Sequence, residues 1–191
     1  NYTEYTNHQD LINSTVKDLI NNNIIAWFQG KMEFGPRALG NRSILAQPNS
    51  KELSKKINSI IKKRESYQPF AASILIEECN KFFVMDKKFD YSYKFMNVVS
   101  ECREEVYNDI QGVIHVDKTC RVQTVSKDDN FLFYDLINNY FKKTNLPLLL
   151  NTSFNLKGEP IVDNPIKAIS TFLRSKCDVL YIGNFKIVND S

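Results

Sequence analysis

The chain has 191 residues, of which 42% are hydrophobic and 12% aromatic; this supports one folded domain and excludes a disordered chain. No run reaches the ~18 apolar residues of a membrane span, and the start lacks the features of a signal peptide. The net charge of +3 is uneven, because the segment from Lys31 to Arg64 holds nine basic and two acidic residues, a net charge of +7. A field of this kind favours anionic partners such as phosphates, nucleotides or nucleic acid.

Hydrophobic periodicity and capping residues predict helices and strands that alternate imperfectly. The expected helices run from Asp10 to Asn21, from the N-cap Ser50 to Ile61, from Asp129 or Asn130 to Tyr140, and onward from Asn164. The expected strands are Ile24–Phe28, Ile44–Ala46, Phe70–Ile76, Lys94–Val99, Val113–Val116, Arg121–Val125, Leu146–Leu150, Val179–Ile182 and Phe185–Val188. We therefore expect an α/β (α+β) fold, with helices packed on a twisted mixed sheet.

The four cysteines, Cys79, Cys102, Cys120 and Cys177, contain no CxxC pair and lie in no zinc-ligand spacing with a histidine. We expect each to act as a small apolar side chain in a reducing, cytoplasmic environment, and we expect no bound metal from these residues. Because the chain begins without Met, it is interpreted as a fragment or a processed chain.

Four polar segments contain the candidate functional residues. In residues 30–43, glycines surround Arg37 and Arg42, and guanidinium groups suit phosphate or carboxylate; a solvated surface loop is the alternative. In residues 62–70, a helical wheel places Lys62 opposite the apolar stripe, so a solvated lysine is the simpler interpretation there. Arg64 would fall back on the stripe if the helix continued, so either this charge has a partner or the helix has already ended.

The other two segments follow strands. Residues 115–125 place His115 and Asp117 near a turn, where a structural histidine is favoured over an acid–base pair. Arg121 lies in a strand-like run, and burial would demand an anion or a carboxylate. Residues 151–160 place hydroxyls and amides after an apolar strand, where ligands of open α/β sheets often bind; a polar turn is the alternative.

In this order, four strings make the sequence resemble the C-terminal domain of the carbamoyltransferase family, which includes antibiotic and nodulation-factor O-carbamoyltransferases. The strings are GKMEFGPRALGNRSIL, KKRESYQPFAASIL, HVDKTCRVQTV and LPLLLNTSFNLKGEPIVDNPIKAISTF, and the ending DVLYIGNFKIV also fits. The resemblance implies that residues 1–191 form a YrdC-like domain, and that residues 1–22 form a leading helix that joins it to a missing N-terminal domain.

The resemblance also implies a reaction, in which carbamoyl phosphate and ATP, with Mg²⁺ bound mainly through the phosphates, give carbamoyl-adenylate and pyrophosphate. The N-terminal domain of the same polypeptide would then transfer the carbamoyl group to a hydroxyl. The catalytic residues implied are Arg37, Lys62, Arg121 and Ser153, and the substrate-binding residues are Arg42, Arg64, Gln68, Asn151, Thr152 and Asn155. The resemblance implies small-molecule substrates, argues against nucleic acid as a partner and is compatible with a homodimer. The absence of a long apolar run argues against a membrane partner.

The chain departs from the family pattern at three positions. Gln68 stands where the family usually has an arginine that we expect to bind phosphate, and Lys118 and Cys120 replace the usual Gly and Ala. Losing one charged hydrogen-bond donor weakens binding by ~1.5–3 kcal/mol. Two further interpretations stay open: a module of RNA modification related to threonylcarbamoyl-adenylate synthases, and a ligand-binding domain without catalysis.

Overall fold

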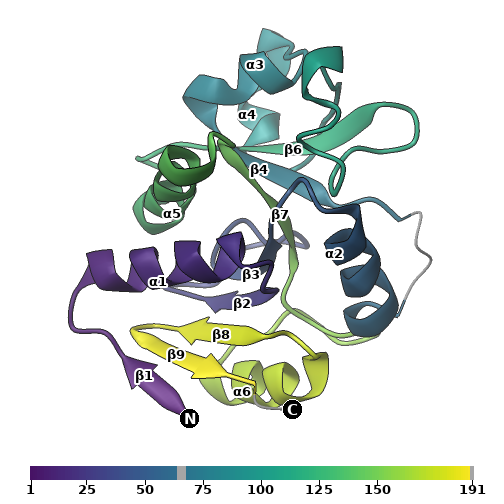
Figure 1. Cartoon of the computed structure of the whole chain (residues 1–191). Helices are drawn as coiled ribbons and strands as arrows, with labels where there is room; N and C mark the ends of the chain where they lie inside the picture. Colours follow the sequence, from purple (N-terminus) through teal and green to yellow (C-terminus); the bar gives the residue numbers. More distant parts are fainter. Residues whose placement is uncertain (64–67, 190–191) are drawn as a thin grey trace.

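The computed structural model describes residues 1–63 and 68–189, which form one nine-stranded mixed sheet with helices on both faces (Figure 1). The strand order is β1-β9-β8-β2-β3-β7-β4-β6-β5. Two neighbouring pairs, β2 with β8 and β4 with β6, are parallel, whereas the other six pairs are antiparallel. The strands are β1 (Tyr2–Glu4), β2 (Ile25–Phe28), β3 (Arg42–Ala46), β4 (Ala71–Leu75), β5 (Val99–Glu101), β6 (Thr119–Val125), β7 (Leu148–Ser153), β8 (Val179–Ile182) and β9 (Phe185–Val188).

The helices begin where the sequence offers capping side chains. Asn7, Ser50, Asn130 and Asn164 each accept a hydrogen bond from a backbone N–H in the first turn of the helix that follows. The α-helices are α1 (His8–Ile20), α2 (Lys51–Lys56), α3 (Cys79–Phe82), α4 (Asp90–Tyr93), α5 (Phe131–Thr144) and α6 (Pro165–Ser175). A π-helical turn (Ile57–Ile61) continues α2, and three short 3₁₀ turns are Ile76–Glu78, Lys87–Phe89 and Glu104–Val106.

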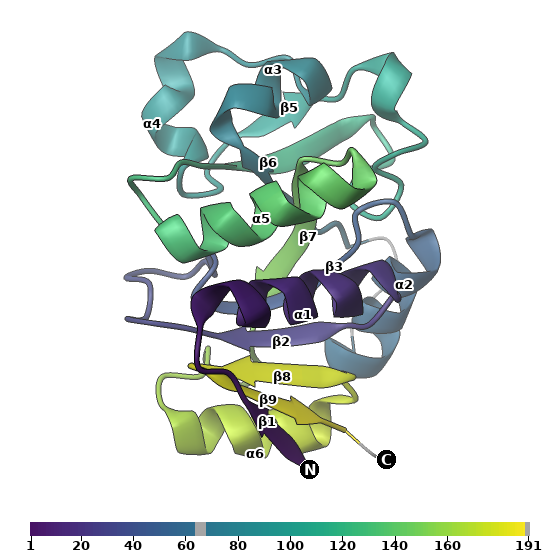
Figure 2. The same ribbon diagram turned by 60° about the vertical axis from the view of Figure 1, so that its left-hand side comes forward.

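The two long helices α1 and α5 lie side by side across one face of the sheet (Figure 2). Their apolar stripes bury residues such as Val16 and Ile137 against Trp27, Leu149 and Tyr181 of the strands. The helix expected at the start of the chain is therefore α1, and it is part of the core of this domain. Its role as a link to another domain stays a prediction.

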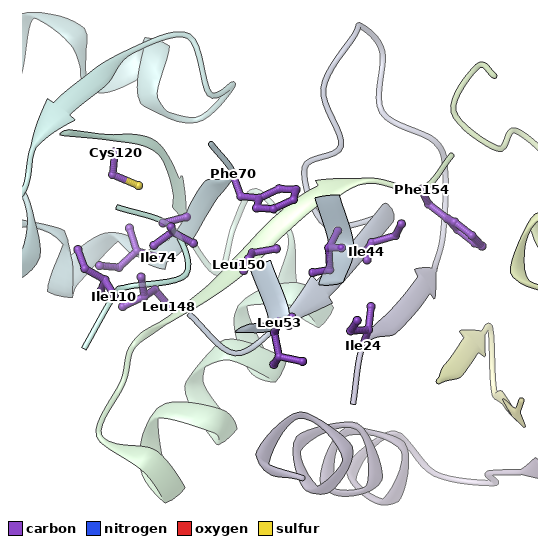
Figure 3. Packing of buried hydrophobic residues seen from close by; sticks show 14 of the residues in the cluster. Ile24, Ile44, Leu53, Phe70, Ile74, Ile110, Cys120, Leu148, Leu150 and Phe154 are labelled. Atoms are coloured by element: carbon purple, nitrogen blue, oxygen red, sulfur yellow. The ribbon is translucent and has the colours of Figure 1, made fainter. Parts of the chain in front are cut away.

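The other face of the sheet is covered by α2 with its π-helical turn, by α3 and by α6. Figure 3 shows Leu53, Ile44, Leu150 and Phe154 among the side chains of this second apolar layer. All four cysteines are free and buried, and all four belong to this layer, so the prediction that they act as small apolar residues is confirmed.

Two strand predictions are wrong. Residues 94–98 form a turn in which Met96 has a φ of 56°, and the strand begins only at Val99. Residues 113–116 are also a turn, since Val113 and Ile114 both donate their backbone N–H to Ile110 O. Val98, Val113 and Ile114 pack on the core from irregular backbone, and the sequence pattern does not distinguish this from a buried strand.

Candidate functional site

The loop between β2 and β3 is closed at its base by an acid and an arginine. Glu33 Oε1 accepts hydrogen bonds from the backbone N–H groups of Leu39 (2.7 Å), Asn41 (2.8 Å) and Arg42 (3.2 Å). The Arg42 guanidinium donates to Gln29 O (2.7 Å), Asn41 O (2.9 Å) and Gly30 O (3.0 Å). Arg42 is buried with its guanidinium 3.6 Å from the centre of the Phe28 ring. This predicted binding residue therefore ties the ends of the loop together.

The tip of the loop, residues 34–37, is exposed and carries Arg37. Phe34 is fully exposed on the same tip. The hydrogen bonds of Glu33 and Arg42 hold the base of the loop on the sheet. The position of Arg37 relative to the sheet is therefore fixed.

A polar network on three neighbouring strands holds the second half of this loop on the sheet. Asn151 of β7 donates to Ala38 O (3.2 Å) and to Ser73 Oγ of β4 (2.9 Å). Ser73 donates in turn to Gln123 Oε1 of β6 (2.6 Å), and Gln123 Nε2 donates to Leu39 O (3.0 Å). Sequence reasoning missed Ser73 and Gln123, although a polar residue inside a buried strand was a usable signal.

Lys62 lies at the end of β7, where it binds two of the other predicted residues. Its Nζ donates to Ser153 O (2.5 Å) and Oγ (3.2 Å), and to Asn155 O (3.1 Å) and Oδ1 (2.8 Å). Ser153 Oγ also donates to Asn155 Oδ1 (2.6 Å), and Asn155 Nδ2 donates to Glu159 O (2.7 Å). Three residues that lie far apart in the sequence thus form one hydrogen-bonded cluster.

The burial of Lys62 overturns the interpretation as a solvated helix residue, since its exposure is only 7%. The physical reason is the π-helical turn, in which Lys62 N donates to Ile57 O (2.9 Å), five residues back. One extra residue in a turn rotates the following side chains relative to an ideal α-helix, so the helical wheel fails beyond Ile57.

Arg121 of β6 occupies the same sheet edge without a compensating acid. It pairs in register with Ala71, which pairs on its other side with Asn151, so the three residues form a row about 10 Å wide. Arg121 Nε is buried and has no hydrogen-bond partner. Burial lowers the pKa of Arg121, and the nearby positive charge of Arg37 lowers it further. In the described residues, no Asp or Glu forms an ion pair with either arginine.

The remaining predicted residues lie apart from this cluster or outside the described structure. Thr152 points to the opposite face of the sheet, since it alternates with Asn151 and Ser153 and pairs with the core residue Ile44. Gln68 is exposed; its backbone O accepts a hydrogen bond from Asn58 Nδ2 (2.9 Å). Arg64 lies outside the described residues.

The arrangement can bind an anion at the edge where β7 ends and where β4 and β6 begin. Within residues 1–63 and 68–189, the His, Cys, Asp and Glu side chains form no cluster of three that could hold a metal ion. None of the helices described is long and apolar enough to cross a membrane.

Comparison with solved structures defines the class of fold. The chain resembles full-length HypF in its phosphate- and nucleotide-bound form, with a TM-score of 0.63 and 19% identity over 93% of this chain and 25% of HypF. It also resembles P. abyssi Sua5 complexed with L-threonine, with a TM-score of 0.65 and 14% identity over 95% of this chain and 48% of Sua5. The fold is YrdC-like, as the sequence predicted.

Sequence comparison then gives the family. The family model described as Carbamoyltransferase C-terminus matches residues 16–189, so the chain belongs to this family, as the resemblance of its motifs implied.

Two relatives from bacteria illustrate the family. Nodulation protein NolO of Bradyrhizobium diazoefficiens is 47% identical over 93% of this chain and 32% of its own length. The 3'-hydroxymethylcephem-O-carbamoyltransferase of Amycolatopsis lactamdurans is 36% identical over 73% of this chain and 26% of its own length. The chain therefore spans a third or less of the length of these relatives.

Proposed function

We propose that the chain is the activating domain of an O-carbamoyltransferase, which forms carbamoyl-adenylate from carbamoyl phosphate and ATP. Family membership and the likeness to a named O-carbamoyltransferase support the transferase class. The observation that carries the site is the unpaired, buried Nε of Arg121 beside the charge of Arg37, because a desolvated cation without an acid needs an anionic ligand.

The proposed reaction has two balanced steps. Water cleaves carbamoyl phosphate to carbamate and inorganic phosphate. A carbamate oxygen then attacks the α-phosphorus of ATP, and the bond to the bridging oxygen breaks, so that pyrophosphate leaves and carbamoyl-adenylate remains. Negative charge on the phosphoryl oxygens is stabilised by fixed cations in sites of this kind.

The residues of this chain take separate parts in the proposal. Arg37 and Arg121 hold the phosphoryl oxygens. Ser153 and Asn155 orient the carbamoyl group by hydrogen bonds, and Lys62 keeps both in place from the end of its π-helical turn. Mg²⁺ would enter with the phosphates of ATP. The part of the longer protein that this chain does not include would transfer the carbamoyl group to a hydroxyl acceptor.

The binding step is tested by calorimetric titration of carbamoyl phosphate into the protein and into Arg121→Ala. We expect the variant to bind at least tenfold more weakly, because it loses charged hydrogen bonds to the phosphate. The control is Arg103→Ala, which removes an exposed arginine that donates to Asn80 O on the far side of β6. Equal affinity of Arg121→Ala and the control variant for carbamoyl phosphate would contradict the proposed site.

The chemical step is tested by phosphorus NMR of carbamoyl phosphate, ATP and Mg²⁺ with the full-length enzyme. We expect inorganic phosphate, pyrophosphate and an adenylate to appear together, and the pyrophosphate to require carbamoyl phosphate. Pyrophosphate that forms at the same rate without carbamoyl phosphate would contradict the activation step.

A further inference from the structure

Helix α6 presents apolar side chains on its outer face as well as on its inner face. Ala168 and Phe172 are buried in the core layer, as expected of an amphipathic helix packed on a sheet. On the outer face, Ile166, Ile169 and Leu173 recur at the helical spacing of three and four residues, with exposed fractions of 81%, 38% and 63%. A contiguous apolar stripe that faces water is typical of a surface that another molecule covers.

An apolar cavity of about 540 Å³ lies beside this stripe, between α6 and the strands β1, β8 and β9. None of the described residues that line it is charged; they are Tyr2, Phe28, Gly30, Pro165, Ile169, Ile182, Gly183, Phe185 and Ile187. Tyr2 and Phe185 are both exposed and make an edge-to-face contact, with ring centres 6.0 Å apart. Figure 2 shows α6, β9 and β1 together at this end of the sheet. Because Ile169 belongs to both the cavity and the stripe, the two form one apolar surface, which we call the α6 surface.

The extent of the α6 surface favours a protein segment over a small molecule. Ile166 and Leu173 belong to the stripe but do not line the cavity, so a ligand confined to the cavity leaves both side chains in water. Strand β1 ends the strand order of the described sheet on this side, and its three residues are all exposed. Apolar side chains beside an exposed edge strand are typical of surfaces on which another chain segment docks.

The α6 surface borders the candidate functional site on two sides. Phe28 and Gly30 line the cavity, and they lie at the base of the loop that carries Arg37. Arg174 of α6 donates to both carboxylate oxygens of Glu159 (2.6 and 3.3 Å), which lies in the loop after β7. A protein segment docked on the α6 surface would therefore lie next to both loops of the candidate site.

We propose that the α6 surface docks the part of the longer protein that precedes this domain. The matching family model is that of a C-terminus, and the match covers only 32% of NolO, so most of such a protein lies outside this domain. Tyr2 itself lines the cavity, so the polypeptide that precedes it begins at the rim of the α6 surface. A part joined there by a short linker has an effective concentration on the order of 1 mM, whereas a second copy associates from free solution. The inference rests on the proposed function where it takes this preceding part to be the one that transfers the carbamoyl group.

The test is the rate at which a maleimide alkylates a cysteine placed on the α6 surface, in the full-length protein and in the 191-residue chain. The four native cysteines of this chain are buried, and burial raises the pKa of each thiol, so their own labelling is slow. We expect Leu173→Cys and, separately, Ile166→Cys to react at least about tenfold more slowly in the full-length protein, because docking removes the thiol from solvent. Mass spectrometry of the peptide that holds the new cysteine measures each rate.

The matched control is Tyr91→Cys on α4, where the side chain is 75% exposed and lies at the other end of the sheet from α6 (Figure 1). Its labelling rate should be the same in the full-length protein and in the 191-residue chain. Far-UV circular dichroism verifies that the three variants fold.

Three outcomes would overturn the inference. The first is an equal labelling rate in the two proteins at both positions of α6, and the second is equal slowing of Tyr91→Cys in the full-length protein. The third is labelling of Leu173→Cys that slows as the concentration of the 191-residue chain rises, because a second copy would then cover the surface. The labelling needs neither carbamoyl phosphate nor ATP, so failure of the inference is distinguishable from failure of the proposed function, which the titration of Arg121→Ala reports.

Discussion

Arg37 and Arg42 lie on the same loop, yet the structure gives them different surroundings. Arg42 is buried and donates to three backbone carbonyls, whereas Arg37 is exposed near the unpaired Arg121. One arginine therefore holds the loop and the other is available to a ligand. Substitution of Arg42 is therefore expected to lower stability, whereas substitution of Arg37 is expected to weaken ligand binding.

We expect Arg42→Met to lower the free energy of unfolding by about 3 kcal/mol, because it leaves the carbonyls of Gln29, Gly30 and Asn41 without their buried donor. Arg37→Met should change stability by less than about 0.5 kcal/mol and should weaken carbamoyl-phosphate binding. Urea denaturation and calorimetry separate the two effects. The distinction fails if Arg37→Met destabilises the protein as much as Arg42→Met.

His115 should make the stability of the domain depend on pH. Burial lowers its pKa from the usual value near 6.5, and Arg121 also lowers it, although Asp117 acts in the opposite direction. Its Nδ1 lies 3.0 Å from Thr119 Oγ1. At neutral pH we therefore expect an uncharged ring.

The difference between the folded and unfolded pKa of His115 decides whether stability rises or falls with pH. Because the folded pKa is below the unfolded pKa, the stabilisation is fully present above pH 6.5 and decreases as the pH falls through that value. Denaturation at pH 7.5 and 5.5 should therefore show a stability loss that His115→Asn reduces. NMR titration of the ring in a His8→Asn background, which leaves one histidine, would contradict this if the midpoint were above 6.5.

At the scale of elements, capping side chains predicted helix starts well, and apolar runs predicted strands less well. Ser50, Asn130 and Asn164 each accept the backbone hydrogen bond that defines an N-cap. Val98, Val113 and Ile114 pack on the core from segments that lie outside the strands. A cap is a local interaction, whereas strand pairing depends on a partner distant in sequence.

The contact between the loop of residues 29–41 and α5 depends on Gly40, which has a φ of +105°. A Cβ there would lie 2.2 Å from the Phe133 ring, and the carbonyl already accepts a hydrogen bond from Trp27 Nε1 (2.8 Å). We expect Gly40→Ala to cost at least about 3 kcal/mol, from backbone strain and displacement of a buried ring.

The matched control for that substitution is Gly158→Ala, at a φ of +77° with open space around the added Cβ. It should cost only the strain, about 1–2 kcal/mol. Thermal or urea unfolding of both variants measures the difference. Equal destabilisation would mean that the Phe133 ring moves aside without cost.

At the scale of the whole molecule, β7 is shared by the two apolar layers of the domain. Leu149 points to the layer under α1 and α5, and Leu150 points to the layer under α2 and α6. Both side chains are fully buried. One sheet therefore connects two cores, and we expect them to unfold together.

Leu149→Ala and Leu150→Ala should each lower the free energy of unfolding by about 3 kcal/mol, because each leaves a cavity in a packed layer. Both variants should unfold in a single transition when followed by near-UV and far-UV circular dichroism. The exposed Val116→Ala serves as the control and should be nearly neutral. Two separate transitions in either core variant would show that the layers are independent domains.

The sequence by itself determined the fold class, most of the elements and the main cationic and polar residues, because periodicity, caps and ordered motifs are local properties. Only the tertiary structure decided which of these residues meet: it buried Lys62 against Ser153 and Asn155, left Arg121 unpaired beside Arg37, and placed Arg42 inside the loop. The physical reason is that the register of the sheet and one π-helical turn set the directions of these side chains, and both depend on packing between distant segments.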